Sequence, residues 1–230
     1  MSGFYALVAS FKKALAETPQ ILDVNYLGDI DRANVEQLFK SNNGTEIPLL
    51  DKRTDNLREA GQVLKKKYNG QFINALEAAG FDAIEIVKLL YQDFPSFRDI
   101  ARLDGNNIFI LKRAQICPND LSYLLKLGGR EITNLENLTA FADYKIPQML
   151  REAGMIKYSY DLAKRIDNYI LIPSGSREEV EIRAATIWGV ELIRRRIQKH
   201  KSNEIDNALW LLSQDQKGLR PYHRTYTIYY

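Results

Sequence analysis

One acidic residue is a candidate for chemistry because of what surrounds it. Asp143 lies between Phe141 and Tyr144 in the stretch TAFADYKIPQMLREAG, residues 139–154. A carboxylate at a break between two helical runs can be aimed into a cleft, where it stabilises positive charge or acts as a base. The commoner role of Asp at such a break is a cap or turn former, and the local pattern alone favours that role.

The break itself is predicted from the proline that follows. Pro147 biases Ile146 away from helical geometry, and it suits the first turn of a new helix. That helix, PQMLREA, is expected to end at Gly154, a residue type common just past helix ends. One helical run is therefore predicted to end near Asp143 and another to begin at Pro147.

Two further positions carry groups that could join Asp143. Lys112 opens the stretch KRAQ directly after the apolar residues 108–111, which fit either a short strand or a buried helical turn. Cations after a buried run often line a cleft, although a solvated face is the commoner outcome. Asp206 and Trp210 are four residues apart, so they share one face of a short helix predicted over about 204–212.

Composition excludes several functional classes. The 32 basic and 29 acidic residues leave a net charge of +3, too small to indicate a nucleic-acid-binding protein. A single cysteine, Cys117, excludes an internal disulfide and a multi-cysteine zinc site, and it fits a reducing, cytoplasmic location. With only His200 and His223, no metal is expected, and no organic cofactor is indicated. No apolar run reaches membrane-spanning length, so no membrane association is expected.

The periodicity predicts an all-α protein with minimal β content. The 230 residues suffice for one large or two small domains. Gly61 is expected to be tolerated inside its helix at modest cost. The aromatic tail, residues 221–230, is expected to be tied down as a strand or an extended arm. Helices are predicted over residues 4–15, 31–40, 48–69, 72–79, 82–91, 118–126, 147–153, 159–166 and 178–200, with the pair at 147–166 forming a helix–hairpin–helix unit.

Eight short motifs, taken together and in order, resemble the queuosine salvage protein family. Each motif is weak alone, but the resemblance runs from residue 2 to residue 230. The motifs are SGFYALVASFKKAL (2–15), EIPLLDKRTDNLREAG (46–61), FPSFRD (94–99), KRAQI (112–116), FADYKIPQML (141–150), EVEIRA (179–184), Asp206 with Leu209-Trp210, and HRTYTIYY (223–230).

The resemblance implies a function and a fold. Members of this family are queuosine 5′-phosphate N-glycosylases, which release the 7-deazaguanine base queuine for reuse in transfer RNA. It also implies a single helical domain over residues 1–230, similar to the helix–hairpin–helix DNA glycosylases. The expected partner is a small nucleotide, not a nucleic acid.

The resemblance assigns roles to particular residues. Asp143 matches the acid of the family's Ala-Asp-Tyr-Arg motif, so it is the expected catalytic carboxylate beneath an oxocarbenium-like sugar. Lys112 is expected to contact the phosphate or the base. Asp206 is expected to accept from guanine-like N–H donors or from the amine of queuine. Phe141 and Trp210 offer stacking faces for the base, with ordinary core packing an equal alternative.

The chemistry of the base and several further residues also bear on the predicted site. A 7-deazapurine lacks N7, so the departing base must be stabilised at its other edges. EVEIRA suggests an internal ion pair between Arg183 and Glu181, and His223 is a weaker candidate for a phosphate contact. Lys145 stands where the family usually has arginine, which keeps the charge but loses bidentate geometry.

Three alternatives to the leading hypothesis stay open. Family members carry a segment ahead of the part that matches Ser2, so this sequence is a fragment, a chain with a misassigned start or a shortened homologue, and if the segment is truly absent we expect the site to lack a wall. Such a chain can be a catalytically silent module that binds the nucleotide or base, which predicts thermal stabilisation by ligand without turnover. A glycosylase for bases in DNA or RNA is disfavoured by the weak net charge. A purely structural helical protein predicts neither binding nor turnover.

Overall fold

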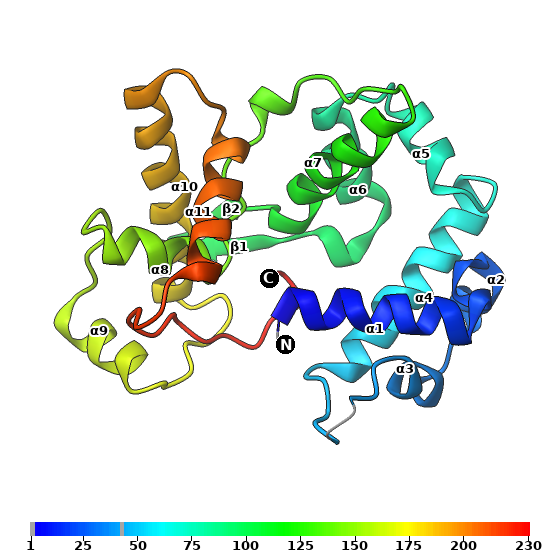
Figure 1. Ribbon diagram of the computed structural model, residues 1–230, viewed down its shortest axis with the longest axis horizontal. Coiled ribbons are helices and arrows are strands. Elements are labelled where there is room, and N and C mark those ends of the chain that lie inside the picture. Colours follow the sequence, from blue (N-terminus) through cyan, green and yellow to red (C-terminus); the bar gives the residue numbers. More distant parts are fainter. Residues whose placement is uncertain (1–2, 42–43) are drawn as a thin grey trace. The chain divides into compact units, whose positions relative to one another are not determined.

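A computed structural model of the chain describes residues 3–41 and 44–230 and shows a mostly helical protein (Figure 1). The described residues form eleven α-helices and one two-stranded hairpin, so the prediction of an all-α protein with minimal β content is confirmed. The chain divides into two compact units, which we describe separately: residues 1–80 with 92–96 form unit 1, and residues 81–91 with 97–230 form unit 2. The single-domain organisation stays a prediction.

Unit 1 is built around a small apolar core formed by residues of the first four helices and the turns between them. Val35 and Ile30 are fully buried in it, and Leu7 and Phe11 of the first helix pack against it. Phe4, Val8 and Leu15 of that helix stay exposed, so the predicted apolar face is only half covered in unit 1. Its elements are α1 (Gly3–Glu17), η1 (Pro19–Leu22), α2 (Val24–Asp29), α3 (Arg32–Leu38), α4 (Leu50–Lys67) and α5 (Phe72–Ala78).

A close helix crossing explains the glycine inside α4. A Cβ atom added at Gly61 would lie 2.3 Å from the backbone nitrogen of Gly28 in α2 and 2.7 Å from the carbonyl oxygen of Val24. These are backbone atoms, so they cannot rotate away as a side chain could. Gly61 is therefore more than a tolerated break in the helix pattern, because the contact between α2 and α4 requires a residue without a Cβ.

Unit 2 contains the predicted site residues and the remaining elements. After α6 (Ala83–Asp93, whose last two residues belong to unit 1) and η2 (Pro95–Phe97, at the boundary), the chain forms β1 (Ile100–Leu103) and β2 (Asn106–Phe109). Then follow α7 (Lys112–Leu127), η3 (Leu135–Asn137), α8 (Lys145–Glu152), α9 (Tyr160–Asp167), α10 (Arg177–Ile197) and α11 (Ser202–Asp215).

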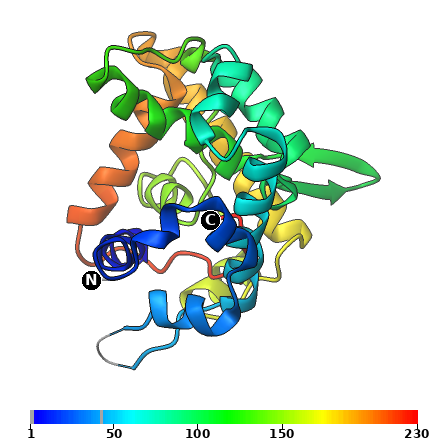
Figure 2. The same cartoon turned by 90° about the vertical axis from the view of Figure 1, so that its right-hand side faces the viewer.

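The hairpin resolves the ambiguity of the apolar run at residues 108–111. β1 and β2 are antiparallel, with Ile100 opposite Phe109 and Leu103 opposite Asn106 (Figure 2). The two turn residues, Asp104 and Gly105, have φ values of 49° and 79°, as a two-residue turn of primed type requires. The first half of the run is therefore strand, and the second half leads directly into α7.

The start of α7 corrects one prediction. Pro118 was expected to open a helix, but α7 begins six residues earlier, at Lys112, and continues through Pro118. The early start depends on a distant contact: the backbone N–H of Lys112 donates to the Asp99 carboxylate at 3.0 Å, which satisfies a donor at the helix N-terminus. The proline leaves the carbonyl of Ala114 without its usual helical donor, a cost that the helix tolerates.

Helices α8 and α9 lie where two helices joined by a turn were predicted, and their assignment as a helix–hairpin–helix unit stays a prediction. Gly154 ends α8 with φ of 72°, and the N–H groups of Gly154 and Met155 donate to the carbonyls of Arg151 and Leu150, as in a Schellman motif. The hydroxyl of Ser159 accepts from the N–H of Leu162 and caps α9, as predicted.

The chain ahead of α8 corrects two further predictions. Ile146 was expected to avoid helical geometry, but it lies inside α8, because Asp143 already provides acceptors for the first N–H groups. Residues 138–143 form neither helix nor strand, and only the single turn η3 precedes them. Asp143 therefore sits between an irregular segment and a helix.

Three helices hold the core of unit 2. α8, α10 and α11 pack around Leu150, Val190 and Ile205. α10 has Glu178 and Glu179 in its first turn and three arginines in its last, charges that match the helix dipole. No helix within the described residues is long and apolar enough to cross a membrane.

The tail is tied down as an extended arm, as one of the two predictions had it, and adds no strand within residues 219–230. The N–H of Ile172 donates to the carbonyl of Arg224 at 2.8 Å, and the hydroxyl of Tyr229 donates to the carbonyl of Arg98 at 3.1 Å. His223 is fully buried.

Substituting Gly61 with alanine tests the close crossing in unit 1. In an open helix, Gly→Ala stabilises by about 1 kcal/mol. Here the clash with backbone should reverse the sign and destabilise by about 1–3 kcal/mol, as overpacking does. Thermal denaturation should show a Tm lowered by several degrees. Gly28→Ala is the matched control, because the nearest atoms to its Cβ, in Gln62 and the backbone of Gly61, would lie 3.5 Å or more away. Equal Tm values for Gly61→Ala and wild type would contradict the interpretation.

Candidate functional site

The Asp143 carboxylate is held at the entrance to α8 by the helix backbone. Its Oδ1 atom accepts from the N–H of Lys145 at 2.7 Å and from the N–H of Ile146 at 3.0 Å. The capping role that the local sequence favours is therefore present. Both donors belong to the first turn of the helix, where the helix dipole favours negative charge.

One oxygen of Asp143 remains for chemistry. Asp143 is 8% exposed, and its Oδ2 atom forms no hydrogen bond with any residue that the structure describes. Burial raises the pKa of Asp143, while Lys112 and the N–H groups of Ile146 and Lys145 oppose part of that rise. Capping and catalysis are thus compatible here, since each can use a different oxygen of the same carboxylate.

A second carboxyl group lies close to the first. Asp206, on α11, is 4% exposed, and its Oδ1 atom accepts from the backbone N–H of Phe141 at 2.8 Å. This bond joins α11 to the segment that carries Asp143. Burial, followed by the charge of Asp143, raises the pKa of Asp206 well above its ordinary value, against smaller opposing effects of the Phe141 N–H and of Lys112. The two carboxyls therefore interact directly through their charge.

Lys112 brings a positive charge to the same place. It is the first residue of α7, and its ammonium lies near enough to lower the pKa of Asp143 and Asp206 against the larger effect of burial. Its side chain makes no ion pair within 4 Å among the described residues, so it is held near the carboxyls without being neutralised by one of them. The structure thus gathers Lys112, Asp143 and Asp206, three of the five residues predicted from the sequence.

The two aromatic candidates are placed differently. Phe141 is 1% exposed, and its ring belongs to the buried interior, while its backbone N–H orients Asp206. Trp210 is half-buried and packs against the core that α8, α10 and α11 share. Both placements agree with the core-packing alternative, and a stacking role for either ring stays a prediction.

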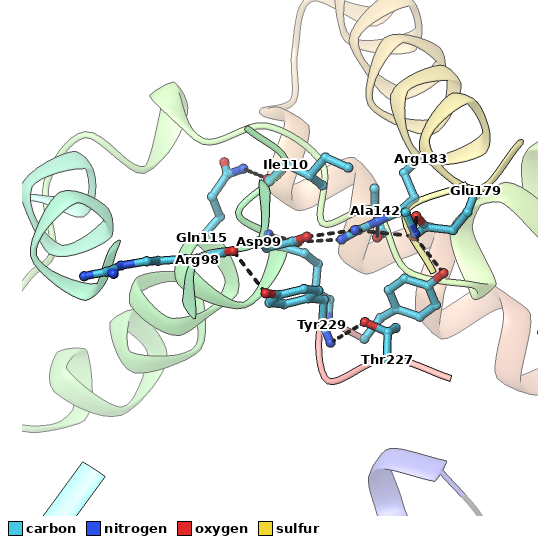
Figure 3. Close-up of polar contacts among 12 residues, drawn as sticks. Arg98, Asp99, Ile110, Gln115, Ala142, Glu179, Arg183, Thr227 and Tyr229 are labelled. Atoms are coloured by element: carbon cyan, nitrogen blue, oxygen red, sulfur yellow. Dashed lines mark hydrogen bonds and ion pairs between the residues drawn. The ribbon is translucent and has the colours of Figure 1, made fainter. Parts of the chain in front are cut away.

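The sequence did not reveal the group that organises this site, a buried ion pair between Asp99 and Arg183. The Arg183 guanidinium meets the carboxylate of Asp99 in two bonds, from Nη1 to Oδ1 at 2.8 Å and from Nη2 to Oδ2 at 2.6 Å (Figure 3). Both side chains are 2% exposed. The expected pair of Arg183 with Glu181 is wrong: Glu181 faces Arg177 on the exposed side of α10. Asp99 and Arg183 lie 84 residues apart, so no local pattern could pair them.

Further contacts surround this pair. The Arg183 Nε donates to the carbonyl of Ala142 at 3.1 Å, and Nη1 lies 3.5 Å from the Oε1 of Glu179. The ring of Tyr230 lies against the guanidinium, with 4.9 Å from Cζ to the ring centre, and its hydroxyl donates to Glu179 at 3.0 Å. Figure 3 shows Arg183 reaching from α10 to Asp99 and Ala142 together. The pair therefore connects the hairpin, α10 and the segment before Asp143.

His223 is unsuited to hold a phosphate in this structure. It is 1% exposed, and its Nε2 atom lies 3.2 Å from the hydroxyl of Tyr230. Burial, helped by the charge of Arg183, lowers the pKa of His223 to about 4, so the ring is neutral near pH 7. The weaker prediction for this residue finds no support in its surroundings.

Two other kinds of site were sought in the described residues, a hollow and a metal-binding cluster. A hollow of about 560 Å³ lies on unit 1, lined by charged side chains that include Arg58, Glu59 and Lys67. None of the predicted site residues borders it, and Glu59 and Lys67 already bind Ser96 and Asp93. Across residues 3–41 and 44–230, no cluster of three or more His, Cys, Asp or Glu side chains could hold a metal ion.

Comparison with known proteins agrees with the resemblance seen in the motifs. The family described as Queuosine salvage protein matches residues 1–230, so the chain belongs to the queuosine salvage protein family. A relative from Sphaerobacter thermophilus is 43% identical over 99% of this chain and 72% of its own length. One from Mus musculus is 34% identical over all of this chain and 72% of its own, and one from Dictyostelium discoideum is 35% identical over 99% and 71%. Each relative is named queuosine 5′-phosphate N-glycosylase/hydrolase.

The buried carboxyl of Asp206 predicts a pH-dependent stability. Its pKa is raised in the folded state, so it contributes stability at low pH that is lost as pH rises toward the raised pKa. Asp206→Asn stays neutral and can still accept from Phe141. The Tm of this variant minus that of wild type should therefore increase between pH 4.5 and pH 8. Asp161→Asn, which changes an exposed carboxylate of the same unit, is the control. A Tm difference independent of pH would exclude the raised pKa.

Proposed function

We propose that this chain hydrolyses the N-glycosidic bond of queuosine 5′-phosphate and releases queuine, which can then be used again in transfer RNA. The observation that carries the proposal is the convergence of Lys112, Asp143 and Asp206 in a chain that matches the family over residues 1–230. The relatives named for this activity support it over nearly the whole chain. The small net charge supports a free nucleotide as substrate in preference to a nucleic acid.

The reaction needs negative charge beneath the sugar. When the bond between C1′ and the base nitrogen breaks, its electron pair leaves with the base, and positive charge develops on C1′ and the ring oxygen. The ionised Oδ2 of Asp143 can stabilise that charge and take a proton from the attacking water, or it can attack C1′ itself. Both routes require Asp143 to be ionised, and its two backbone donors and Lys112 favour that state.

The departing base needs a proton or a hydrogen bond, and its deaza ring offers no N7 to receive it. Asp206, whose pKa is raised by burial and by Asp143, fits this requirement as a neutral carboxyl group that donates. Its proton goes to the base, the water oxygen forms the new bond to C1′, and the water proton goes to Asp143. The products are queuine and the sugar 5-phosphate, and proton exchange with solvent restores both carboxyls. This role differs from the predicted one, in which Asp206 accepts from the base.

The remaining candidates have supporting roles in this proposal. Lys112 can meet the phosphate or an edge of the base, since no described carboxylate is paired with its ammonium. Phe141 orients Asp206 through its N–H and, with Trp210, shapes the apolar side of the site. We further infer that α8 and α9, joined by a turn in which Gly154 has φ of 72°, correspond to the helix–hairpin–helix of DNA glycosylases.

Base release by purified protein tests the proposal. Wild type incubated with queuosine 5′-phosphate should release queuine, detected by mass spectrometry. Asp143→Asn should lower kcat by about 10²–10⁴-fold, the usual contribution of a positioned acid or base. Asp161→Asn should leave release unchanged. Binding of the nucleotide by wild type without any release would instead favour a silent binding module.

The pH profile separates the roles of the two carboxyls. We expect kcat/KM to be bell-shaped, falling at low pH as Asp143 takes up a proton and at high pH as Asp206 loses one. Asp206→Asn should be slower but should lose the fall at high pH, because an amide donates across the whole range. If the high-pH limb persists in that variant, another group is the acid.

A further inference from the structure

Two backbone segments must be held at a fixed separation for this site to work. One begins α7 and carries Lys112, and the other precedes α8 and carries Asp143. The two segments bond directly through Gln115 of α7 and Thr139, from the Thr139 N–H to Oε1 at 2.9 Å and from Nε2 to the Thr139 Oγ1 at 3.0 Å, but neither is a site residue. Each segment is also bound to one member of the same buried ion pair, at the residue that carries the site group or directly precedes it.

The first contact fixes Lys112. The Oδ2 atom of Asp99 accepts from the backbone N–H of Lys112 at 3.0 Å. The backbone carbonyl of Asp99 also accepts from the N–H groups of Ile110 and Leu111, each at 3.1 Å. Leu111 has φ of 50°, a left-handed conformation that a branched residue adopts only when its surroundings impose it. Asp99 therefore holds a strained turn that sets where α7, and with it Lys112, begins.

The second contact fixes Asp143. The Nε atom of Arg183 donates to the carbonyl of Ala142, the residue directly before Asp143, at 3.1 Å. The other two donor groups of the same guanidinium hold Asp99. The planar guanidinium thus sets the spacing between Asp99 and Ala142, and through them the spacing between Lys112 and Asp143.

Stability alone gives little reason for such a pair. Removing two charges from water is costly, and apolar residues of similar volume often replace a buried pair without loss of stability. Apolar residues could not, however, bind the N–H of Lys112 or the carbonyl of Ala142. We propose that Asp99 and Arg183 are positioning residues for the glycosidic reaction, which set the separation between the Lys112 ammonium and the Asp143 carboxylate. This positioning role rests on the proposed function.

The decisive variant removes both charges together. Asp99→Leu with Arg183→Met should have a Tm below that of wild type but above those of the single variants, because neither charge of the pair is left without the other, while buried Glu179 loses Arg183 and keeps its bonds with Tyr230 and Gly175. It should lower kcat by about 10–100-fold, as small misplacements of reacting groups do, with a smaller change in KM. Wild-type kcat in the folded double variant would overturn the proposal, because the pair would then be only structural.

Two comparisons make the result specific. Arg151→Met with Asp167→Leu removes another bidentate Arg–Asp pair of the same unit, one whose bonds include no backbone atom next to Lys112, Asp143 or Asp206. This control should keep kcat, whatever its Tm. Arg183→Lys keeps the charge but loses the planar geometry that lets one side chain donate two hydrogen bonds to Asp99 and one to Ala142. It should therefore give an intermediate kcat. It also serves as the test if the double variant does not fold, and full activity in Arg183→Lys would then count against the proposal.

A readout that does not depend on turnover separates this proposal from the proposed function. The pKa of the Asp143 carboxyl can be followed by ¹³C NMR in wild type and in the variants. Lys112 lowers that pKa against burial, so loosening Lys112 should raise it further. If wild type releases no queuine, the proposed function fails, but the pKa comparison still applies. An unchanged pKa in the double variant would overturn the positioning role.

Discussion

The buried contact between Asp99 and Arg183 is the interaction on which the arrangement of unit 2 depends. The two side chains, each 2% exposed, are stabilised there because they bond to each other twice, and because Arg183 also donates to Ala142 and Asp99 also accepts from Lys112. Asp99 lies next to the hairpin and accepts from the N–H of Lys112 at the start of α7. Arg183 lies on α10 and donates to the carbonyl of Ala142 in the segment before α8. Loss of one partner would leave a charge without compensation in the interior. The pair therefore imposes one relative placement on the segments that carry the site.

The site uses the same residue type in two different environments. Asp143 lies at a helix N-terminus with two backbone donors, so its charged form is supported although it is buried. Asp206 has one backbone donor and the charge of Asp143 beside it, which favour its neutral form. In the proposed reaction, one residue type therefore provides both the carboxylate and the carboxylic acid. Their surroundings provide the difference.

How much the sequence predicts depends on the range of the interactions. The helix end at Gly154 was predicted because capping chemistry acts over a few residues. The start of α7 and the helical state of Ile146 were predicted wrongly, because Asp99 and Asp143 decide them through contacts with the chain that local propensity does not include. Lys112, Asp143 and Asp206 were predicted as site residues from motifs, but no local spacing could indicate the long-range contacts around them, those of Asp99 with Arg183 and of Phe141 with Asp206.

The distances along the chain between bonded residues have a consequence for synthesis. Asp99 lies 84 residues before Arg183, and Phe141 lies 65 residues before Asp206. Closing loops of this length costs entropy before any contact compensates for it, so such contacts form late. On the ribosome, α6 to α9 can emerge and fold locally while the Asp99 carboxylate still faces water. The site can be assembled only after α11 has been translated, so a growing chain has no working glycosidic centre during most of its synthesis.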